Sequence, residues 1–529
     1  MKHQSTELIC GAVVLGAGLL GLAGCMTVGP DYQRPQTATP TNWSGALSAG
    51  LSGAATDTNL LAQWWTVFND PVLSDLIERA RAGNLDLRRA EARVREARAQ
   101  RGIAKADLFP TVGANASASR TRASEEAGNG QTSDFYAAGF DASWELDIFG
   151  GKRRSLESAT ASWQAAEESL RDVLVSLLAE VALNYVEVRS YQELVSITES
   201  NVITRTETYD ITRWRREAGL TTQLDVDQAR LSLEQVRAQV PTLRTSLEQA
   251  KYRLAVLLGL PPGALHELLA EAKRVPGTPA EVAVGMPADL LRRRPDVRTA
   301  ERQLAAQTAQ IGVAKAALYP NFSLLGSLGV ESLQFANLYS GSAYAAQGLA
   351  KAAWTLFDGG AIRQNIKVQT ARQEEALSYY ESTVLTALKD VESALVAYAN
   401  EQIRRQALTE AVKSGQSAFE LARDQYTSGL VSFQTVLDTQ QSLLSAQDQL
   451  AVSQAKVTSN LISLYKSLGG GWMPPEPGVS SERMARAKSE VQSPKSETGS
   501  RSEISKTPYS QGPHAVPPAT GETASQQTL

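Results

Sequence analysis

The residues that most often carry chemistry are few and scattered in this chain of 529 residues. The three histidines, His3, His266 and His514, lie far apart in sequence, and the two cysteines are Cys10 and Cys25. Such a set supports neither a zinc site nor a nucleophile served by a histidine base. Acidic residues are spread along expected helix faces, where solvated charge is the ordinary interpretation. We therefore predict no enzyme, no metal and no bound cofactor.

The composition also excludes several classes of function. A G-x-G-x-x-G pattern at residues 16–21 does not precede a strand–turn–helix unit, and there is no P-loop, so we expect no nucleotide site. The formal charge of −4 does not support nucleic-acid binding, which usually needs a basic patch. The mean hydropathy of −0.23 excludes a helical membrane protein with many spans.

The N-terminus carries the pattern of an export signal. Lys2 precedes an apolar stretch at residues 8–22, and small residues follow, so we interpret residues 1–24 as a signal peptide. The quartet Leu22-Ala23-Gly24-Cys25 resembles the bacterial lipobox, which implies a covalent lipid on Cys25. A plain signal peptide or an uncleaved anchor is the alternative. Met26 stands where lipoproteins of the inner membrane typically carry Asp, which favours the outer membrane.

An internal duplication with a period of 210 residues organises the elements that follow. The segment 103–110 matches 313–320, and Trp144 matches Trp354. The Gly-Leu pair at 219–220 matches the Gly-Leu pair at 429–430. The polar C-terminal tail lacks the apolar residues that would offset the entropy of ordering it, so we predict that it is disordered. The predicted domains are an N-terminal arm (25–70), a first repeat (71–262), a linker (263–286), a second repeat (287–473) and the tail (474–529).

Each repeat is predicted to contain a long helical hairpin. Between Gly151 and Gly219 there is no Pro and no Gly, which leaves 67 residues free to form one helix of roughly 100 Å. A helix after each Gly-Leu turn, at 222–258 and 432–468, predicts two antiparallel hairpins. Shorter helices at 72–107 and 287–317 open the repeats. Apolar steps of four and three predict coiled-coil seams at Leu170, Leu174, Leu177, Val181, Asn184, Val188, Tyr191 and Val195, and at Val384, Ala387, Val391, Ala394 and Tyr398.

Between the opening helix and the long helix of each repeat, the apolar period changes to two. The alternation in the second repeat is interrupted by Leu349 and Ala353. Strands of this kind fit a transmembrane β-barrel, and a soluble sheet with one wet face is the alternative. The expected strands are 112–119, 136–148, 321–330 and 344–356.

The number of strands constrains the assembly. Two strands per repeat give four per chain, whereas membrane barrels begin at about eight strands, because no strand edge may face lipid. A barrel must therefore be shared between copies, as eight strands in a dimer or twelve in a trimer. The charged outer faces of the hairpins place them outside lipid, in the periplasm.

Four motifs resemble the outer-membrane factors of the TolC/OprM type, and in particular their NodT-like subgroup. They are VGPDYQRP (28–35), PADLLRRRPD (287–296), IGVAKAALYP (311–320) and LFDGG (356–360). The resemblance covers about residues 25–473. It implies a mixed α and β membrane protein of TolC-like fold, in which a homotrimer shares a twelve-stranded barrel above a periplasmic tunnel of twelve helices.

The same resemblance implies a function and partners. The chain is expected to be the exit duct of a tripartite efflux system in the outer membrane, served by a periplasmic adaptor (membrane fusion) protein and an inner-membrane pump that is proton-driven or of the ABC class. The alternatives are the duct of a type I protein secretion system and a lipid-anchored coiled-coil structural protein.

The hairpin turns are the first candidate sites that the resemblance implies. Gly219 and Leu220 in the first turn, and Gly429 and Leu430 in the second, match the family turns that dock against the adaptor. Neither turn has the family's frequent Val before Gly. A glycine that merely permits a left-handed residue at a helix end is the alternative interpretation.

The second candidate site is a periplasmic aperture. Asp438, nine residues after Gly429, matches the carboxylate that rings the closed aperture of the family, and three copies imply a ring that selects cations. The further aperture candidates are Thr435, where TolC-like members add an Asp, Gln441, where OprM-like members carry Arg, and Asp225, the corresponding acid of the first turn. A solvated helix carboxylate is the alternative for Asp438.

Overall fold

The computed structural model describes residues 27–37, 40–45, 47–54, 57–287 and 293–473. The predictions for the signal peptide (1–24), Cys25 and the tail (474–529) lie outside the described residues. Among the described residues, no helix combines the length and the apolar character that crossing a membrane requires.

Two helices replace the single helix expected over 72–107, so that prediction was wrong in detail. They are α3 (Pro71–Gly83) and α4 (Leu85–Ala106). Asn84 separates them: its side chain accepts a hydrogen bond from the backbone N–H of Leu87 and so caps α4. The side-chain amide of Asn84 also donates to the carbonyl of Leu257 at 2.8 Å. The break between the two opening helices thus contacts the C-terminal end of the helix that ends at Leu257, 173 residues later.

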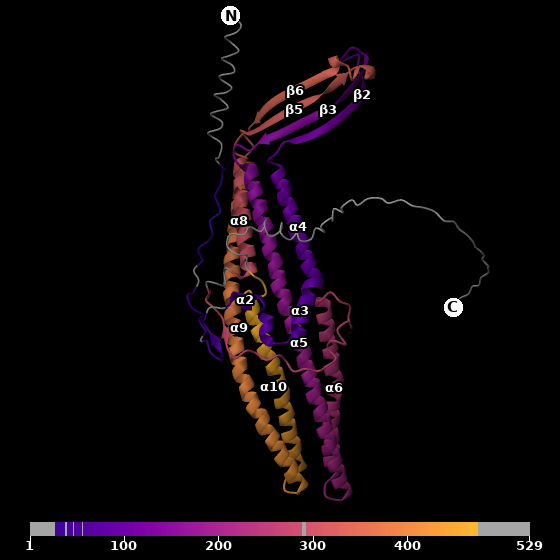
Figure 1. Cartoon of the computed structure of the whole chain (residues 1–529), viewed down its shortest axis with the longest axis vertical. Coiled ribbons are helices and arrows are strands. Elements are labelled where there is room, and N and C mark those ends of the chain that lie inside the picture. The colour runs from indigo at the N-terminus through magenta and orange to yellow at the C-terminus, as the bar shows by residue number, and fades with distance from the viewer. Residues whose placement is uncertain (1–26, 38–39, 46, 55–56, 288–292, 474–529) are drawn as a thin grey trace, which may run out of the picture. The chain divides into compact units, whose positions relative to one another are not determined.

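The predicted hairpins are present in both repeats. The long helices α5 (Gly151–Glu217) and α9 (Ala361–Thr427) have 67 residues each, and the returning helices α6 (Gln223–Leu257) and α10 (Phe433–Ser467) have 35 each. Figure 1 shows both hairpins running side by side with their turns at the same end. In the second repeat Pro287 and Arg293 are helical, and residues 288–292 lie outside the described part. The helix α8 (Pro295–Ala316) begins after Arg294.

An Asp side chain between a strand and a long helix starts the helix in each repeat. The carboxylate of Asp147 accepts hydrogen bonds from two backbone N–H groups at the start of α5, at 3.0 and 2.8 Å. Asp358 accepts in the same way at the start of α9, at 2.8 and 2.6 Å. Gly150 (φ 82°) and Gly360 (φ 92°) turn the chain into the helix, in the left-handed region that glycine adopts without strain. An Asp followed by a Gly-Gly pair, directly in the second repeat and after two intervening residues in the first, therefore marks the turn from strand to helix.

The four strands form one antiparallel sheet in the order β2-β3-β5-β6. The pair β3–β5 joins the two repeats, and Gly139 faces Gly329 there, where a Cβ on Gly139 would lie 2.9 Å from the Cα of Gly329. Within the described residues, β2 and β6 pair on one side only. The strands are β2 (Thr111–Arg122), β3 (Thr132–Leu146), β5 (Asn321–Ser332) and β6 (Tyr344–Ala353).

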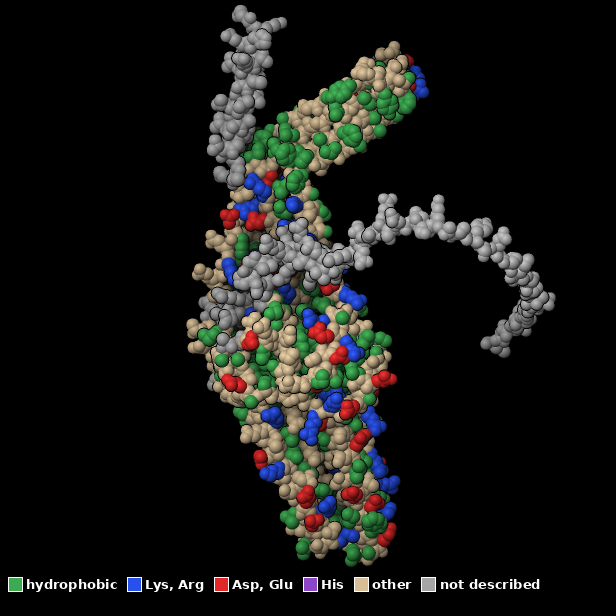
Figure 2. Space-filling view, viewed as in Figure 1, with side chains coloured by type: hydrophobic (Ala, Val, Ile, Leu, Met, Phe, Trp, Pro, Cys, Tyr) green, Lys and Arg blue, Asp and Glu red, His purple; other side chains and the backbone are tan. Residues whose placement is uncertain are grey.

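The predicted alternation separates the two faces of this sheet. One face carries large apolar side chains, among them Phe140, Trp144, Leu324 and Leu328, which are 39–61% exposed in the single chain. The other face carries mainly small and polar residues. Figure 2 shows few charged side chains on the visible surface of the sheet away from its loop end, in contrast to the helices below. Charged side chains are thus rare in the middle of the visible surface of the sheet.

The N-terminal arm and the linker complete a core where the two repeats meet. In the arm lie β1 (Leu51–Ser52), α2 (Thr58–Ala62) and the 3₁₀ helix η1 (Trp64–Phe68), and β1 pairs in parallel with β4 (Val282–Ala283) of the linker. Trp64 stacks on Tyr465 with ring centroids 5.8 Å apart.

The coiled-coil seam predicted on the second long helix, α9, is buried throughout. On α5 only Leu177, Val181 and Val188 of the predicted seam are buried. The buried residues of this helix are spread around it, because α3, α4, α6, α8 and α10 all pack against it.

Candidate functional site

Both hairpin turns close with the same backbone geometry. Gly219 (φ 73°) and Gly429 (φ 78°) are left-handed, and the next residue in each turn donates its N–H to the carbonyl five residues earlier at 2.8 Å. This Schellman arrangement satisfies carbonyls at the helix end. It leaves Leu220 65% and Leu430 75% exposed at the tips. The turns are therefore tight, and each presents an apolar side chain to solvent.

Asp225 is a helix cap. Its carboxylate accepts a hydrogen bond from the backbone N–H of Thr222 at 3.1 Å, and the Thr222 hydroxyl accepts one from the N–H of Asp225 at 3.3 Å, which is a capping box. Thr221 also donates its hydroxyl to this carboxylate. Burial opposes ionisation, but the hydrogen bonds from Thr221 and Thr222 lower the pKa of Asp225 below its usual range. The side chain is thus engaged in starting α6.

Asp438 and Thr435 lie on the exposed side of α10, one turn apart. Asp438 accepts a hydrogen bond from the side-chain amide of Gln434 at 2.7 Å. The opposite side of the same helix segment is buried through Phe433 and Val436, which belong to an apolar cluster that joins the two hairpins. The carboxylate of Asp438 therefore points away from the core of its own chain.

Gln441 contacts a buried cation that the sequence did not single out. Arg205 of α5 is 3% exposed and donates to the side-chain oxygen of Gln441 at 3.0 Å and to the carbonyl of Ser232 at 3.2 Å. Burial lowers the pKa of Arg205. Its Nε has no hydrogen-bond partner among the described residues. The guanidinium near the candidate aperture thus comes from the first hairpin, and no sequence signal distinguishes it from the many arginines of α5.

Further polar contacts hold the two hairpins together. The side-chain amide of Asn201 donates to the Gln447 side chain at 3.1 Å, and Arg215 donates to the carbonyl of Thr427 at 2.9 Å. The Arg215 guanidinium also lies over the ring of Tyr426, 4.7 Å from its centroid. Separating the hairpins would expose these groups and the apolar cluster around them. The tips therefore form one connected unit in this structure.

Comparison with known sequences decides the family. The family model described as Outer membrane efflux protein matches residues 76–260 and 286–470. The chain belongs to this family. Its two matched segments correspond to the two copies of the internal duplication.

Relatives extend the match over most of the chain. The chain is 33% identical over 457 residues to the probable efflux pump outer membrane protein TtgC of Pseudomonas putida, with 85% of this chain and 93% of the relative covered. It is 33% identical over 461 residues to nodulation protein T of Rhizobium leguminosarum bv. trifolii, with 86% and 96% covered. Among solved structures, the outer-membrane channel OprN matches with a TM-score of 0.80 and 36% identity, over 85% of this chain and all of OprN.

These matches confirm the predicted fold and function. The chain has the TolC-like fold of outer-membrane efflux channels, of mixed α and β class and internally duplicated. It is the exit duct of a tripartite efflux system in the outer membrane.

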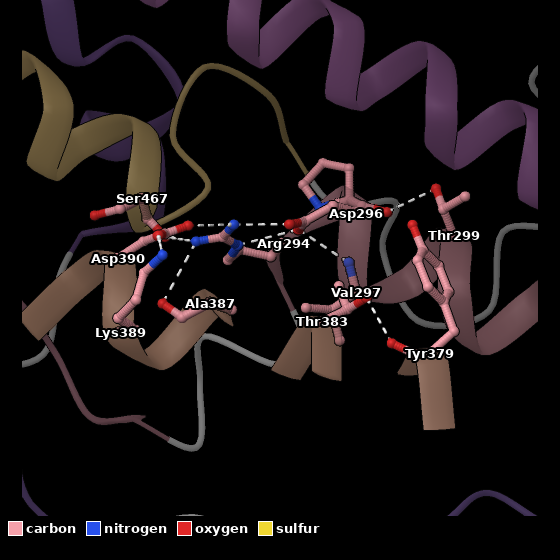
Figure 3. Close-up of polar contacts among 11 residues, drawn as sticks. Arg294, Asp296, Val297, Thr299, Tyr379, Thr383, Ala387, Lys389, Asp390 and Ser467 are labelled. Carbon is pink, nitrogen blue, oxygen red and sulfur yellow. Dashed lines mark hydrogen bonds and ion pairs between the residues drawn. The ribbon is translucent and has the colours of Figure 1, made fainter. Parts of the chain in front are cut away.

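The described part of the family motif at 287–296 holds three helices together (Figure 3). Arg294 donates two hydrogen bonds to the carboxylate of Asp296, at 3.0 and 2.7 Å, and also lies 3.3 Å from Asp390 of α9 and from the carbonyl of Ser467 in α10. Burial would lower the pKa of Arg294, but the two carboxylates raise it above its usual range. A cavity of about 560 Å³ lies beside this group. The motif therefore serves packing between helices.

Proposed function

We propose that three copies of this efflux duct form one continuous conduit. The observation that supports it is the open sheet: four strands whose edges β2 and β6 each lack a second neighbour among the described residues. In lipid, unpaired backbone groups cost several kcal/mol each, so β6 of one copy is expected to pair with β2 of the next. Three sheets of four strands close a barrel of twelve.

The helices follow the same arrangement. In each chain α4, α5, α8 and α9 pack in that order as neighbours below the sheet, so three copies give a wall of twelve helices. The hairpins continue that wall into the periplasm. Substrates delivered from the inner side then pass through the duct without an energy source in this chain.

The tips supply the partner surface in this proposal. Leu220 and Leu430 are apolar and exposed, as expected of residues that become covered by a second protein. The occupant is the periplasmic adaptor, and the inner-membrane pump, proton-driven or of the ABC class, supplies the energy. Asp438, with Thr435 one turn before it, faces the axis in three copies and forms a negatively charged entrance. Asp225 then acts as the cap of α6, and Gln441 acts as a contact between the two hairpins.

A lipid on Cys25 is compatible with the position of the arm. The N–H of Val28 donates to the carbonyl of Phe149 at 3.1 Å, between the end of β3 and the start of α5. Arg154, which is 3% exposed, donates to the carbonyl of Val28 and to the carboxylate of Asp31, at 3.2 and 2.7 Å. Cys25 is three residues before Val28, and three residues span at most about 10 Å. The lipid would thus enter the membrane where strands meet helices.

The mass and conductance of the purified protein test this proposal. Solubilised in a mild detergent, it is expected to have three times the protein mass of one mature chain and to open channels in planar bilayers. A variant with Pro at Ala116, in the middle of edge strand β2, removes an N–H from the edge and should lose both properties. The same substitution at Ala127, which is exposed in the loop between β2 and β3, should keep them. A monomeric wild-type protein, or a trimer that conducts no ions, would falsify the proposal.

A further inference from the structure

The small and polar face of the sheet carries a hollow that crosses all four strands. A cavity of about 420 Å³ lies on this face and is lined from all four strands, among other residues by Ser143, Asp141, Leu325, Gln347 and Leu349. Thr111 and Ser143 close one side of it with a hydrogen bond between their hydroxyls at 2.9 Å. The hollow lies towards the ends of the strands that adjoin the helices.

Two leucines form the apolar part of this hollow. Leu325 of β5 faces Leu349 of β6 in the register, so their side chains are cross-strand neighbours. They are 40% and 51% exposed in the single chain, on a face that alternation otherwise gives to small and polar residues. Leu349 is also one of the two residues that interrupt the alternation in the sequence. Two adjacent leucines on a face that is otherwise small and polar form an apolar surface that an apolar solute can contact.

A carboxylate lies beside the leucines. Asp141 of β3 faces Ser327 of β5. The neighbouring pair on the same face, Ser143 and Leu325, lies two residues further along the strands. That step is about 7 Å. The amide of Asn115 donates to this carboxylate from β2. Within the four described strands, this face carries three acidic residues, Asp141, Glu145 and Glu331, and one basic residue, Lys351. Of these charged residues only Asp141 lines the hollow, and Glu145 is paired with Lys152 at 3.1 Å. The hollow thus combines an apolar pair with one carboxylate.

We propose that this hollow binds organic cations that carry apolar groups, on the inner wall of the duct. The inference rests on the proposed function, because only a closed barrel turns this face towards the lumen. Asp141 attracts the cationic centre, and Leu325 and Leu349 contact the apolar groups. Threefold symmetry places three copies of the hollow at one height, so solutes that leave the helical tunnel meet an apolar belt with adjacent carboxylates. Small inorganic ions gain nothing from the leucines.

Block of single channels in planar bilayers tests the proposal. Tetrapentylammonium and tetramethylammonium share their charge and differ in apolar surface. In the Leu325→Ser, Leu349→Ser double variant, the half-blocking concentration of tetrapentylammonium should rise about tenfold, and that of tetramethylammonium less than twofold. Asp141→Asn should weaken block by both ions. Ser119→Asn, on the same face but six residues beyond Gly113 of the hollow, should change neither.

Two further variants keep the test decisive if the double variant fails to assemble. Leu325→Met and Leu349→Met conserve volume and apolar surface and should retain block by tetrapentylammonium. Asp141→Asn changes charge at constant shape. Channels of normal conductance whose block is the same in the wild type, in Asp141→Asn and in the leucine variants overturn this inference alone. A wild-type protein that opens no channel overturns the proposed function, and the inference with it.

Discussion

Trp144 and Trp354, 210 residues apart, make the same hydrogen bond in the two repeats. Each donates its indole N–H to the carbonyl of a leucine 36 residues earlier, Leu108 or Leu318, at 3.0 Å. Both bonds join the end of a hairpin's second strand to the turn that precedes its first strand. The indoles lie on the apolar face, where strands give way to helices, and tryptophans are enriched at such membrane interfaces. The duplication has thus preserved a contact as well as a pattern.

Replacing either tryptophan by Phe is expected to destabilise its hairpin equally. Each substitution leaves a leucine carbonyl without its donor, which costs about 1 kcal/mol, and the two effects should add because the sites do not share partners. The measurement is thermal unfolding of Trp144→Phe, Trp354→Phe and the double variant in detergent. Trp214→Phe, on an exposed part of α5, is the control. A loss confined to one repeat would contradict the equivalence.

The cap of α6 predicts a dependence of local stability on pH. Because the folded pKa of Asp225 is depressed, its contribution is complete above the unfolded value of about 3.9 and is lost as the pH falls through the folded pKa. The protection factors for hydrogen exchange at the first turn of α6, which compare each rate with that of an unstructured peptide at the same pH, should therefore fall below that value. Thr222→Ala removes the reciprocal bond and should cost about 0.5–2 kcal/mol at neutral pH. The second hairpin supplies the comparison, since Ser432 at the start of α10 makes no side-chain cap bond.

Charge at residue 441 should control how tightly the hairpins adhere. Gln441→Glu gives the buried guanidinium of Arg205 a carboxylate partner in place of an amide and should strengthen the contact. Gln441→Arg places two cations together and should weaken it by about 1–3 kcal/mol. The rate of limited proteolysis at the tips is expected to fall for the first variant and to rise for the second. Equal rates in the two variants would show that Arg205 does not hold the hairpins.

The long helices and the turns could be predicted because their signals are local. A run of 67 residues without Pro or Gly, an alternation of period two and a Gly-Leu pair each determine backbone geometry with little help from the rest of the chain. Asn84, Arg205 and the pairing of β1 with β4 could not be predicted. Each depends on a partner that lies at least 27 residues away and that folding alone brings close.

The lipid on Cys25 is testable by mass. Cys25→Ser should yield a protein without the diacylglycerol and with a lower yield in the outer membrane, while the docked arm, held through Val28 and Arg154, keeps the fold of assembled molecules intact. Mass spectrometry of the mature N-terminus shows whether the lipid is attached. Fractionation of the membranes measures how much protein reaches the outer membrane. A wild-type N-terminus without lipid would contradict the assignment.

The charge of the entrance is the last prediction. Asp438 is exposed and points away from its own hydrophobic core, whereas Asp225 is bound by Thr221 and Thr222 at the start of α6. If three copies of Asp438 converge on the axis, Asp438→Asn should lower the permeability ratio of potassium to chloride by roughly twofold or more and reduce block by divalent cations. Trimer stability should stay nearly unchanged, because the substitution removes no buried contact.

Asp225→Asn is the matched control for this prediction, since it removes the same charge near the other tip. It should loosen the first turn of α6 and leave ion selectivity close to that of the wild type. Both variants are read in planar bilayers at the same ionic strength, because screening by salt weakens the field of exposed carboxylates. Equal shifts of selectivity in the two variants, or none in Asp438→Asn, would mean that the narrowest ring lies elsewhere. Asp438 would then be an ordinary solvated carboxylate on a helix face.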